Sequence, residues 1–381
     1  RIGLRNGQLL ETGGHPVAYA DWLGAPGAPT VLIYGHYDVQ PVDPLSLWDT
    51  PPFEPAVRHG ELYARGAADD KGQVLMHLAA IEALLQTEGV LPVNVKLLIE
   101  GEEEIGSPNL DAFIAAHKEL LAAEVAVISD TPMYGRGIPS LCYGLRGLAY
   151  FQIDVTGPNS DLHSGAFGGA VDNPCNVLAH MLAKLKDEQG HILIPGFYDA
   201  VRPLSGQERR ELAKLPFDEP AYCSAIGVHA LAGEPGYSVL ERTWARPTLD
   251  VNGLWGGFQG AGSKTIIPAE AHAKVSCRLV PDQDPGQVAE QFEAFVRQIA
   301  PPTVAVQVQR LHGGRPSITP IDHPATRAAV KALERAFRKD VVFMREGGSI
   351  PVVATFDSLL GLPTVLLGIG LPDEHAHAPN E

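Results

Sequence analysis

The sequence has few cysteines, no long hydrophobic run and no excess of basic residues. Four cysteines (Cys142, Cys175, Cys223 and Cys277) are spread over 381 residues without a CxxC pair. This pattern excludes a disulfide-rich scaffold, and we expect reduced thiols. No stretch reaches the ~18–20 apolar residues of a membrane helix. Acidic residues outnumber basic ones by 45 to 29. This acidic balance argues against a general nucleic-acid binder and against a binder of anionic membranes.

What remains is the composition of a globular protein. Hydrophobic residues make up 45% of the chain and charged residues 19%, which excludes intrinsic disorder. At ~150 residues per domain, the length predicts two or three domains. The chain begins with Arg1 rather than methionine, so we expect it to be part of a longer gene product.

Short apolar runs alternate with helical patterns at the two ends of the chain. Such runs are typical of strands buried on both faces of a mainly parallel sheet. They lie at 30–35, 93–99, 125–128 and 363–368. A helix is predicted over 73–85, and a second from Ser107 as N-cap and Pro108 as first helical residue through to 121. The alternation predicts an α/β domain.

The middle of the chain follows a different pattern, in which apolar and polar residues alternate. This alternation predicts strands with one wet face at 149–155, 271–280 and 303–311, with helices over 176–185 and 287–299. We therefore predict a discontinuous α/β domain over 1–146 and 317–381. A smaller α+β domain over 147–316 would be inserted into it. The Pro- and Gly-rich region 194–253 gives only partial signals.

Ionisable residues follow the predicted strands, where open α/β sheets place their chemistry. They are His36 and Asp38, Asp69 and Asp70, Glu102 to Glu104, Asp130, and His375 with His377. Two histidines and several carboxylates, with no thiolate, suit Zn²⁺, Mn²⁺ or Co²⁺. Five ligands fit two ions ~3.5–4 Å apart that share one carboxylate. A carboxylate that is not a ligand can then take a proton from a bridging water. Asp38 is well placed to accept the ring N–H of His36.

Several motifs carry a family resemblance that extends over nearly the whole chain. They are GHYDVQP (35–41), ARGAADDKG (64–72), EGEEEIGS (100–107), ISD (128–130), DLHSG (161–165), CRLVP (277–281), HGGRP (312–316), REGGSIP (345–351) and HAPNE (377–381). In this order they resemble the aminoacylase/carnosinase family of dinuclear metallopeptidases. The branch they most resemble is that of the cytosolic non-specific dipeptidases and carnosinases.

The resemblance implies roles for residues of the first domain. His36 and Asp130 would bind one divalent ion, Glu104 and His377 the other, and Asp69 would bridge both. Glu103 would be the general base for a hydroxide that bridges the ions, and Asp38 would orient His36. The HAPNE match favours His377 over His375. The Asp69–Asp70 peptide bond is expected to be cis. Asp70 and Glu102 are expected to be solvated or structural.

The inserted domain resembles the lid and dimerisation domain of the family. His163 would act across the interface of a homodimer, on the carbonyl bound by the partner subunit. Arg278 and His312 would hold a substrate carboxylate. Gly347, Gly348 and Ser349 would supply backbone N–H donors, and Asn252 is a weaker candidate. The resemblance also implies a cytoplasmic protein whose partners are small peptides, neither nucleic acid nor membrane.

The expected function is metal-dependent hydrolysis of dipeptides that have a free C-terminal carboxylate. An N-acyl-amino-acid deacylase on the same scaffold is the alternative, since its chemistry is identical and only the acyl-side pocket differs. A metal-binding scaffold without catalytic activity is a third possibility. The motifs DDKG, EGEEEIGS and HGGRP favour the dipeptidase. Family members usually carry further helices before and after the region covered by this sequence.

Overall fold

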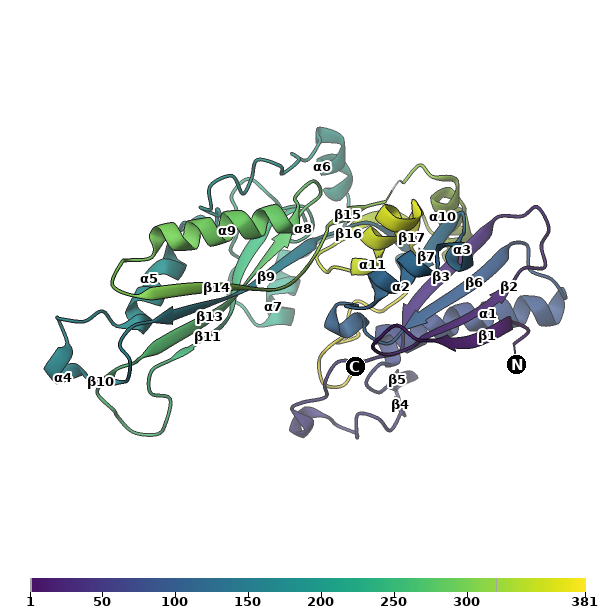
Figure 1. The fold of residues 1–381 in the computed structure, drawn as a ribbon. Coiled ribbons are helices and arrows are strands. Elements are labelled where there is room, and N and C mark those ends of the chain that lie inside the picture. Colours follow the sequence, from purple (N-terminus) through teal and green to yellow (C-terminus); the bar gives the residue numbers. More distant parts are fainter. Residues whose placement is uncertain (1, 320) are drawn as a thin grey trace. The chain divides into compact units, whose positions relative to one another are not determined.

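The computed structural model describes residues 2–319 and 321–381, and it divides into two compact units (Figure 1). Unit 1 consists of Arg1–Gly144, Ile318–Glu346 and Ile350–Glu381. Unit 2 consists of Leu145–Ser317 together with the three residues Gly347–Ser349. The second unit is therefore an insertion, and three residues from the later part of the chain also belong to it.

Unit 1 is organised around a sheet that is parallel at its centre. Its strand order is β1-β2-β6-β3-β7-β17-β8-β15, and β16 pairs with β8. β6, β3, β7 and β17 are parallel neighbours, whereas β1, β2 and β8 pair antiparallel. The bounds are β1 Arg5–Leu10, β2 Val17–Trp22, β3 Thr30–His36, β6 Asn94–Glu100, β7 Val125–Ile128, β8 Ser140–Leu145, β15 Ser317–Ile318, β16 Val342–Glu346 and β17 Thr364–Leu366. The four central strands coincide with the four predicted apolar runs, and the predicted α/β class is confirmed.

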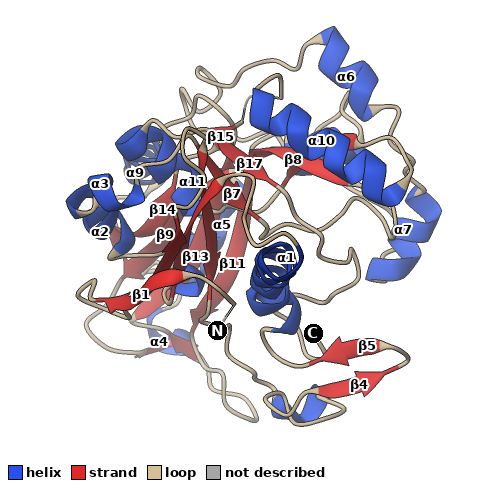
Figure 2. Cartoon of the chain, turned by 90° about the vertical axis from the view of Figure 1, so that its right-hand side faces the viewer, coloured by secondary structure: helices blue, strands red, loops and turns tan. Residues whose placement is uncertain are grey.

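Helices cover both faces of this sheet. Val31 and Ile33 of β3 pack in the clusters that contain α1 (Gln73–Thr87) and α10 (Pro324–Phe337). On the opposite face, the Tyr34 ring meets the ring of Phe356 edge to face, with centroids 5.9 Å apart. α2 (Leu110–Ala116), α3 (Lys118–Leu121), α11 (Pro351–Thr355) and η4 (Phe356–Leu360) complete the helical layers. Figure 2 looks along α1, with the small hairpin of β4 (Ala56–Arg58) and β5 (Glu61–Tyr63) beside the C terminus.

The predicted helix start at Ser107 is wrong. Ser107 has a left-handed backbone (φ 51°), and its hydroxyl donates to the buried Glu100 carboxylate at 2.8 Å. Because that hydroxyl serves Glu100, it does not cap a helix, and α2 begins only at Leu110. The predicted helix also breaks at His117, whose ring Nδ1 lies 2.8 Å from the main-chain oxygen of Phe113.

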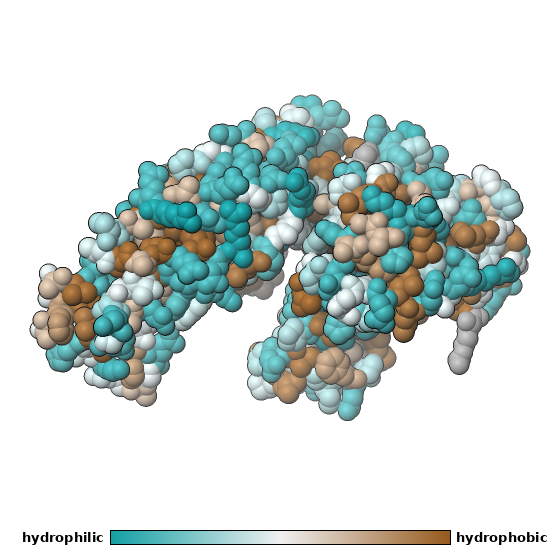
Figure 3. Space-filling model, in the orientation of Figure 1, coloured by the Kyte–Doolittle hydropathy of each residue, from teal (hydrophilic) through white to brown (hydrophobic). Residues whose placement is uncertain are grey.

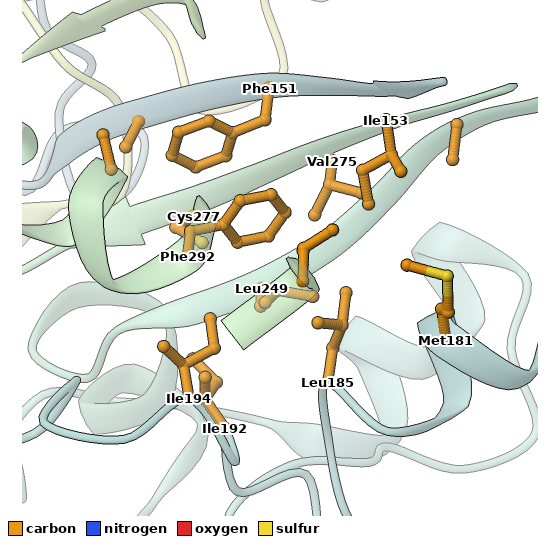
Figure 4. Packing of buried hydrophobic residues seen from close by; sticks show 14 of the residues in the cluster. Phe151, Ile153, Met181, Leu185, Ile192, Ile194, Leu249, Val275, Cys277 and Phe292 are labelled. Carbon is orange, nitrogen blue, oxygen red and sulfur yellow. The ribbon is translucent and has the colours of Figure 1, made fainter. Parts of the chain in front are cut away.

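Unit 2 contains a four-stranded antiparallel sheet in the order β11-β13-β9-β14. Its strands are β9 Gly147–Thr156, β11 Thr248–Gly256, β13 Glu270–Leu279 and β14 Ala305–Gly314. Burial alternates strictly along β13, as the sequence pattern predicts. The apolar face packs on α5 (Pro174–Ala183) and α9 (Pro285–Ile299). The Phe151 and Phe292 rings stack there with centroids 4.2 Å apart (Figure 4).

Shorter elements surround this sheet. They are β10 (Leu162–His163), β12 (Ile266–Ile267), α4 (Ser164–Phe167), α6 (Gly206–Leu212), α7 (Glu219–Ile226) and α8 (Val239–Trp244). The last three helices and most of β11 occupy the region that the sequence left only partly interpretable.

The polarity of the surface and the state of the cysteines agree with the expectations drawn from the composition. Hydrophilic residues cover most of the face seen in Figure 3, and hydrophobic ones reach the surface in separate patches. Over the described residues, no helix combines the length and apolar character needed to span a bilayer. All four cysteines are free, which confirms the expectation of unpaired thiols.

Candidate metal centre

The first candidate ligand lies at the carboxyl end of a central strand. β3 ends at His36, which is 1% exposed. Its Nδ1 lies 3.3 Å from Asp38 Oδ1, and its Nε2 lies 3.0 Å from Asp69 Oδ1. A proton on Nδ1, held by Asp38, leaves the Nε2 lone pair available for a metal ion.

Asp38 has a further role that sequence reasoning missed. Its two carboxylate oxygens also accept the backbone N–H groups of Glu103 at 3.3 Å and Glu104 at 3.0 Å. These residues begin the short helix η3 (Glu103–Ile105), directly after β6. One side chain therefore fixes the orientation of His36 and the position of the turn that carries the candidate base.

Asp69 presents its two carboxylate oxygens to two different histidines. It lies in η2 (Ala67–Gly72) with a non-helical backbone (φ −115°, ψ 94°). Its Oδ1 faces His36, and its Oδ2 lies 3.0 Å from Nε2 of His377. The Asp69–Asp70 peptide bond is cis, which confirms the expectation. The geometry of Asp69 is that of a carboxylate able to bridge two ions.

The five predicted ligands gather into two groups that share Asp69. One group is His36, Asp69 and Asp130, and the other is Asp69, Glu104 and His377. Within each group the potential ligand atoms all lie within 4.8 Å of one another. His375, the alternative ligand, is exposed and belongs to neither group in the part of the chain that the structure describes.

The electrostatics of the centre reflect a surplus of carboxylates. Burial raises the pKa of Asp130 to about 6, and burial together with the Asp130 charge raises the pKa of Glu103 to about 9. Burial lowers the pKa of His36, but hydrogen bonds to Asp38 and Asp69 outweigh it and raise that pKa to about 12. Hydrogen bonds to Asp69 and Glu104 raise the pKa of His377 to about 10. A cluster that retains protons so strongly is one that cations would stabilise.

The donor set therefore fits divalent metal ions. Each group combines an imidazole nitrogen with carboxylate oxygens and has no thiolate, which suits Zn²⁺, Mn²⁺ or Co²⁺. The shared Asp69 matches the bridging carboxylate of a two-metal site.

Two neighbouring carboxylates have structural partners instead. Asp70 is buried, and its Oδ2 accepts the backbone N–H of His36 at 3.3 Å. Glu102 is also buried and accepts from the His15 N–H and from the Asn109 amide. Both are therefore structural rather than solvated.

Sequence reasoning missed other residues beside the ligands. Gln40 donates to Glu104 Oε2 at 2.8 Å. Glu381 accepts the backbone N–H of Asp69 at 3.0 Å. Both lie inside quoted motifs, GHYDVQP and HAPNE, and that position is the only signal in the sequence that marks them.

Unit 2 holds a separate group of predicted substrate-binding residues. Arg278 Nη1 donates to Ser349 Oγ at 3.1 Å. Burial and the positive charge of Arg278 lower the pKa of His312. The main-chain oxygen of Gly347 accepts from Arg146 Nε at 3.1 Å. Gly348 lies between Gly347 and Ser349 in the chain. A guanidinium together with an imidazole close enough to respond to its charge suits an anionic group such as a carboxylate.

The structure does not bring Asn252 into this group. Arg278 pairs with Thr248 in the register of β11 and β13, whereas Asn252 lies at a bulge between Val251 and Gly253. Asn252 therefore lies four residues farther along β11, roughly 13 Å at strand spacing.

His163 lies at the exposed start of α4, outside the four-stranded sheet of unit 2. Its Nδ1 accepts the backbone N–H of Gly165 at 2.9 Å. In the neutral ring this places the proton on Nε2, which can then donate a hydrogen bond.

Comparison with known proteins places the chain in a family. The model of the peptidase family M20/M25/M40 matches residues 32–381. The Cys-Gly metallodipeptidase DUG1 of Candida albicans is 37% identical over 374 residues, which are 96% of this chain and 77% of that protein. The Beta-Ala-His dipeptidase of Homo sapiens is 34% identical over 383 residues, 99% of this chain and 75% of that protein.

A solved structure shares both the fold and the sequence. The M20 family metallo-carboxypeptidase Sso-CP2 from Sulfolobus solfataricus superimposes with a TM-score of 0.90 and 36% identity. The match covers 100% of this chain and 86% of that one. Sequence and fold thus agree over nearly the whole chain, which belongs to the M20/M25/M40 family of metal-dependent peptidases.

Proposed function

We propose that this protein hydrolyses dipeptides that have a free C-terminal carboxylate. The observation that carries the proposal is the pair of ligand groups joined by the two oxygens of Asp69, with Glu103 beside them. The Candida and human relatives are both named dipeptidases, which supports this substrate class. The Sulfolobus protein is named a carboxypeptidase, and that activity also requires a free carboxyl terminus.

Unit 1 would hold two divalent ions, for which Zn²⁺, Mn²⁺ and Co²⁺ are the candidates. His36, Asp69 and Asp130 are the proposed ligands of one ion, and Asp69, Glu104 and His377 those of the other. When bound, such ions polarise the scissile carbonyl and make water a stronger acid and a better nucleophile.

Glu103 is the proposed general base. It would accept a proton from the attacking water and deliver that proton to the leaving amine. Asp38 holds the backbone of Glu103 and would keep this carboxylate in position. Positive charge favours the ionised carboxylate, so bound ions would lower the pKa of Glu103 toward the range of a working base.

Unit 2 is the proposed lid and dimerisation domain. Arg278, His312 and Ser349 would bind the carboxylate of the substrate, with backbone groups at Gly347 and Gly348. We propose a homodimer in which His163 donates from Nε2 to the carbonyl oxygen of a substrate bound by the partner subunit. A cytoplasmic location stays a prediction of the family resemblance.

The decisive experiment is a substrate panel with metal-stripped protein. Zn²⁺, Mn²⁺ or Co²⁺ is added back, and free dipeptides are compared with C-amidated dipeptides, tripeptides and N-acetyl amino acids. We expect metal-dependent cleavage of free dipeptides that is lost on amidation. Cleavage of N-acetyl amino acids alone would show a deacylase. Failure to cleave any substrate, with two ions bound per chain, would favour the metal-binding scaffold.

A further inference from the structure

A buried ion pair lies next to the proposed centre without belonging to either ligand group found among the described residues. Arg65 Nη1 and Glu381 Oε2 are 2.5 Å apart, and their side chains are 2% and 1% exposed. The partners are 316 residues apart in sequence. Burying two charges costs about as much as their attraction returns, so net stabilisation is a poor reason for such a pair.

The second oxygen of Glu381 holds the backbone that carries Asp69. Glu381 Oε1 accepts the N–H of Ala68 at 3.1 Å and that of Asp69 at 3.0 Å. These amides lie in the first turn of η2, where helical N–H groups have no acceptor within the helix. A charged acceptor makes stronger hydrogen bonds to them than a neutral one would. The carboxylate of Glu381 thus fixes the point from which the Asp69 side chain projects.

The other end of the pair reaches the loop that follows His36. Arg65 Nη2 donates to the main-chain oxygen of Pro41 at 3.3 Å, and the guanidinium lies over the Trp48 ring, 5.2 Å from its centroid. Pro41 closes the segment 35–41 that contains both His36 and Asp38.

The pair also anchors the segment of the last ligand. Glu381 follows His377 by four residues, and its main-chain oxygen accepts the N–H of Ala64 at 3.0 Å. One ion pair therefore joins the three segments that carry His36, Asp69 and His377.

We propose that Arg65 and Glu381 are positioning residues that set the affinity of the centre for metal ions. They hold Asp69 so that its two oxygens face the two histidines. This inference rests on the proposed ligand set, and the experiment separates the two.

The test compares Glu381→Gln and Arg65→Lys with the unaltered chain. The glutamine amide offers one acceptor and places a donor against Arg65 or against the two backbone N–H groups. The lysine keeps the charge but lacks the fork that reaches Glu381 and Pro41 together. Glu234→Gln is the matched control, because Glu234 pairs with Arg246 at 2.7 Å in unit 2, with both side chains largely buried. Asp69→Ala is the reference for loss of a ligand.

The primary readout is the dissociation constant of Mn²⁺ and of Zn²⁺, measured by calorimetric titration of metal-stripped protein. Circular dichroism and the urea midpoint report folding. We expect both pair variants to bind metal about 10- to 100-fold more weakly, as loss of outer hydrogen-bond partners generally does. At saturating metal we expect KM for a dipeptide to be unchanged and kcat to recover.

Three outcomes overturn the inference. The first is unchanged metal affinity in folded Glu381→Gln and Arg65→Lys when Asp69→Ala loses affinity. The second is an equal loss in Glu234→Gln, which would indicate general destabilisation. The third is unchanged affinity in Asp69→Ala, which refutes the ligand set and this inference with it. If Glu381→Gln does not fold, Glu381→Asp and Arg65→Lys are judged by the same criterion.

Discussion

Replacing Asp38 by asparagine tests how the centre is held together. The carboxylate of Asp38 has three contacts: the His36 ring and the backbone N–H groups of Glu103 and Glu104. Asparagine has the same shape, but only one of its two terminal atoms accepts a hydrogen bond. With its oxygen at the Oδ1 position, it retains the contacts to His36 and Glu103 and faces the Glu104 N–H with a donor.

The size of the expected loss of activity follows from the number of hydrogen bonds that asparagine cannot make. In its best orientation the asparagine loses one hydrogen bond to a charged acceptor, the 3.0 Å bond from the Glu104 N–H. Such a bond contributes about 1.5–3 kcal/mol. At about 1.36 kcal/mol per factor of ten, this corresponds to about 10- to 160-fold in kcat/KM if all of it reaches the transition state. Asp38→Ala loses all three contacts and should be worse.

The assay is steady-state hydrolysis of a free dipeptide at saturating metal, with bound metal measured in the same samples. Asp21→Asn is the control, because Asp21 is a buried carboxylate of unit 1 that accepts from Asn6 and Tyr19. It should affect stability but not kcat/KM. If Asp38→Asn had the same kcat/KM as the unaltered enzyme, the reasoning would be refuted. It would also be refuted if kcat/KM of Asp38→Ala were no lower than that of Asp38→Asn.

Three further predictions concern the base, the carboxylate-binding group and the fold of unit 2. Glu103→Gln should lower kcat by about 10²- to 10⁴-fold while metal analysis still finds two ions per chain; a comparable loss of metal would contradict its assignment as base. Arg278→Lys should raise KM for a free dipeptide about 10-fold or more, and an unchanged KM for that dipeptide would remove Arg278 from substrate binding. Burial raises the pKa of Glu241, but hydrogen bonds from Arg209 and Ser238 outweigh it and hold that pKa below its usual value. Because the pKa of Glu241 is lower in the folded than in the unfolded state, the stabilisation is present at neutral pH. It is lost as the pH falls through the folded-state pKa. Glu241→Gln should therefore reduce the free energy of unfolding by about 1–3 kcal/mol at pH 7. The difference in urea midpoint between the unaltered protein and Glu241→Gln should become smaller in acid. A difference that does not change with pH would exclude the ionised carboxylate as its cause.

The centre of unit 1 could be predicted because burial on two faces leaves a strong sequence signal. β3 and β7 read as apolar runs, β6 reads as one interrupted by Lys96, and each is followed by ionisable residues. Parallel neighbours bring those residues to one edge of the sheet. This physical rule is enough to place His36, the Glu103–Glu104 turn and Asp130 together from the pattern of residues alone.

Elements without a buried face gave no such signal. β1 is exposed along nearly its whole length, and its sequence RNGQLL neither alternates nor forms an apolar run. The hairpin of β4 and β5 has strands of three residues with no buried side chain. These strands form through backbone pairing, which depends little on side-chain type.

The supporting contacts of the site could not be predicted, because they join residues far apart in sequence. Ser107 has the spacing of a helix cap, yet the nearby Glu100 carboxylate takes its hydroxyl. Glu381 accepts backbone N–H groups whose donors are 312 and 313 residues away. Every residue except proline offers a backbone N–H, so the sequence does not mark which one is the partner.

The position of β17 has a consequence for synthesis of the chain. β17 lies between β7 and β8, although it follows them by more than two hundred residues. During translation, unit 2 is almost complete when residue 317 emerges, and it can fold as a unit. Until residue 366 emerges, β7 keeps an unpaired edge of buried, apolar residues. A ribosome that stalls between these points would carry a folded insertion attached to an open sheet, and such a nascent chain should depend on chaperones that shield strand edges.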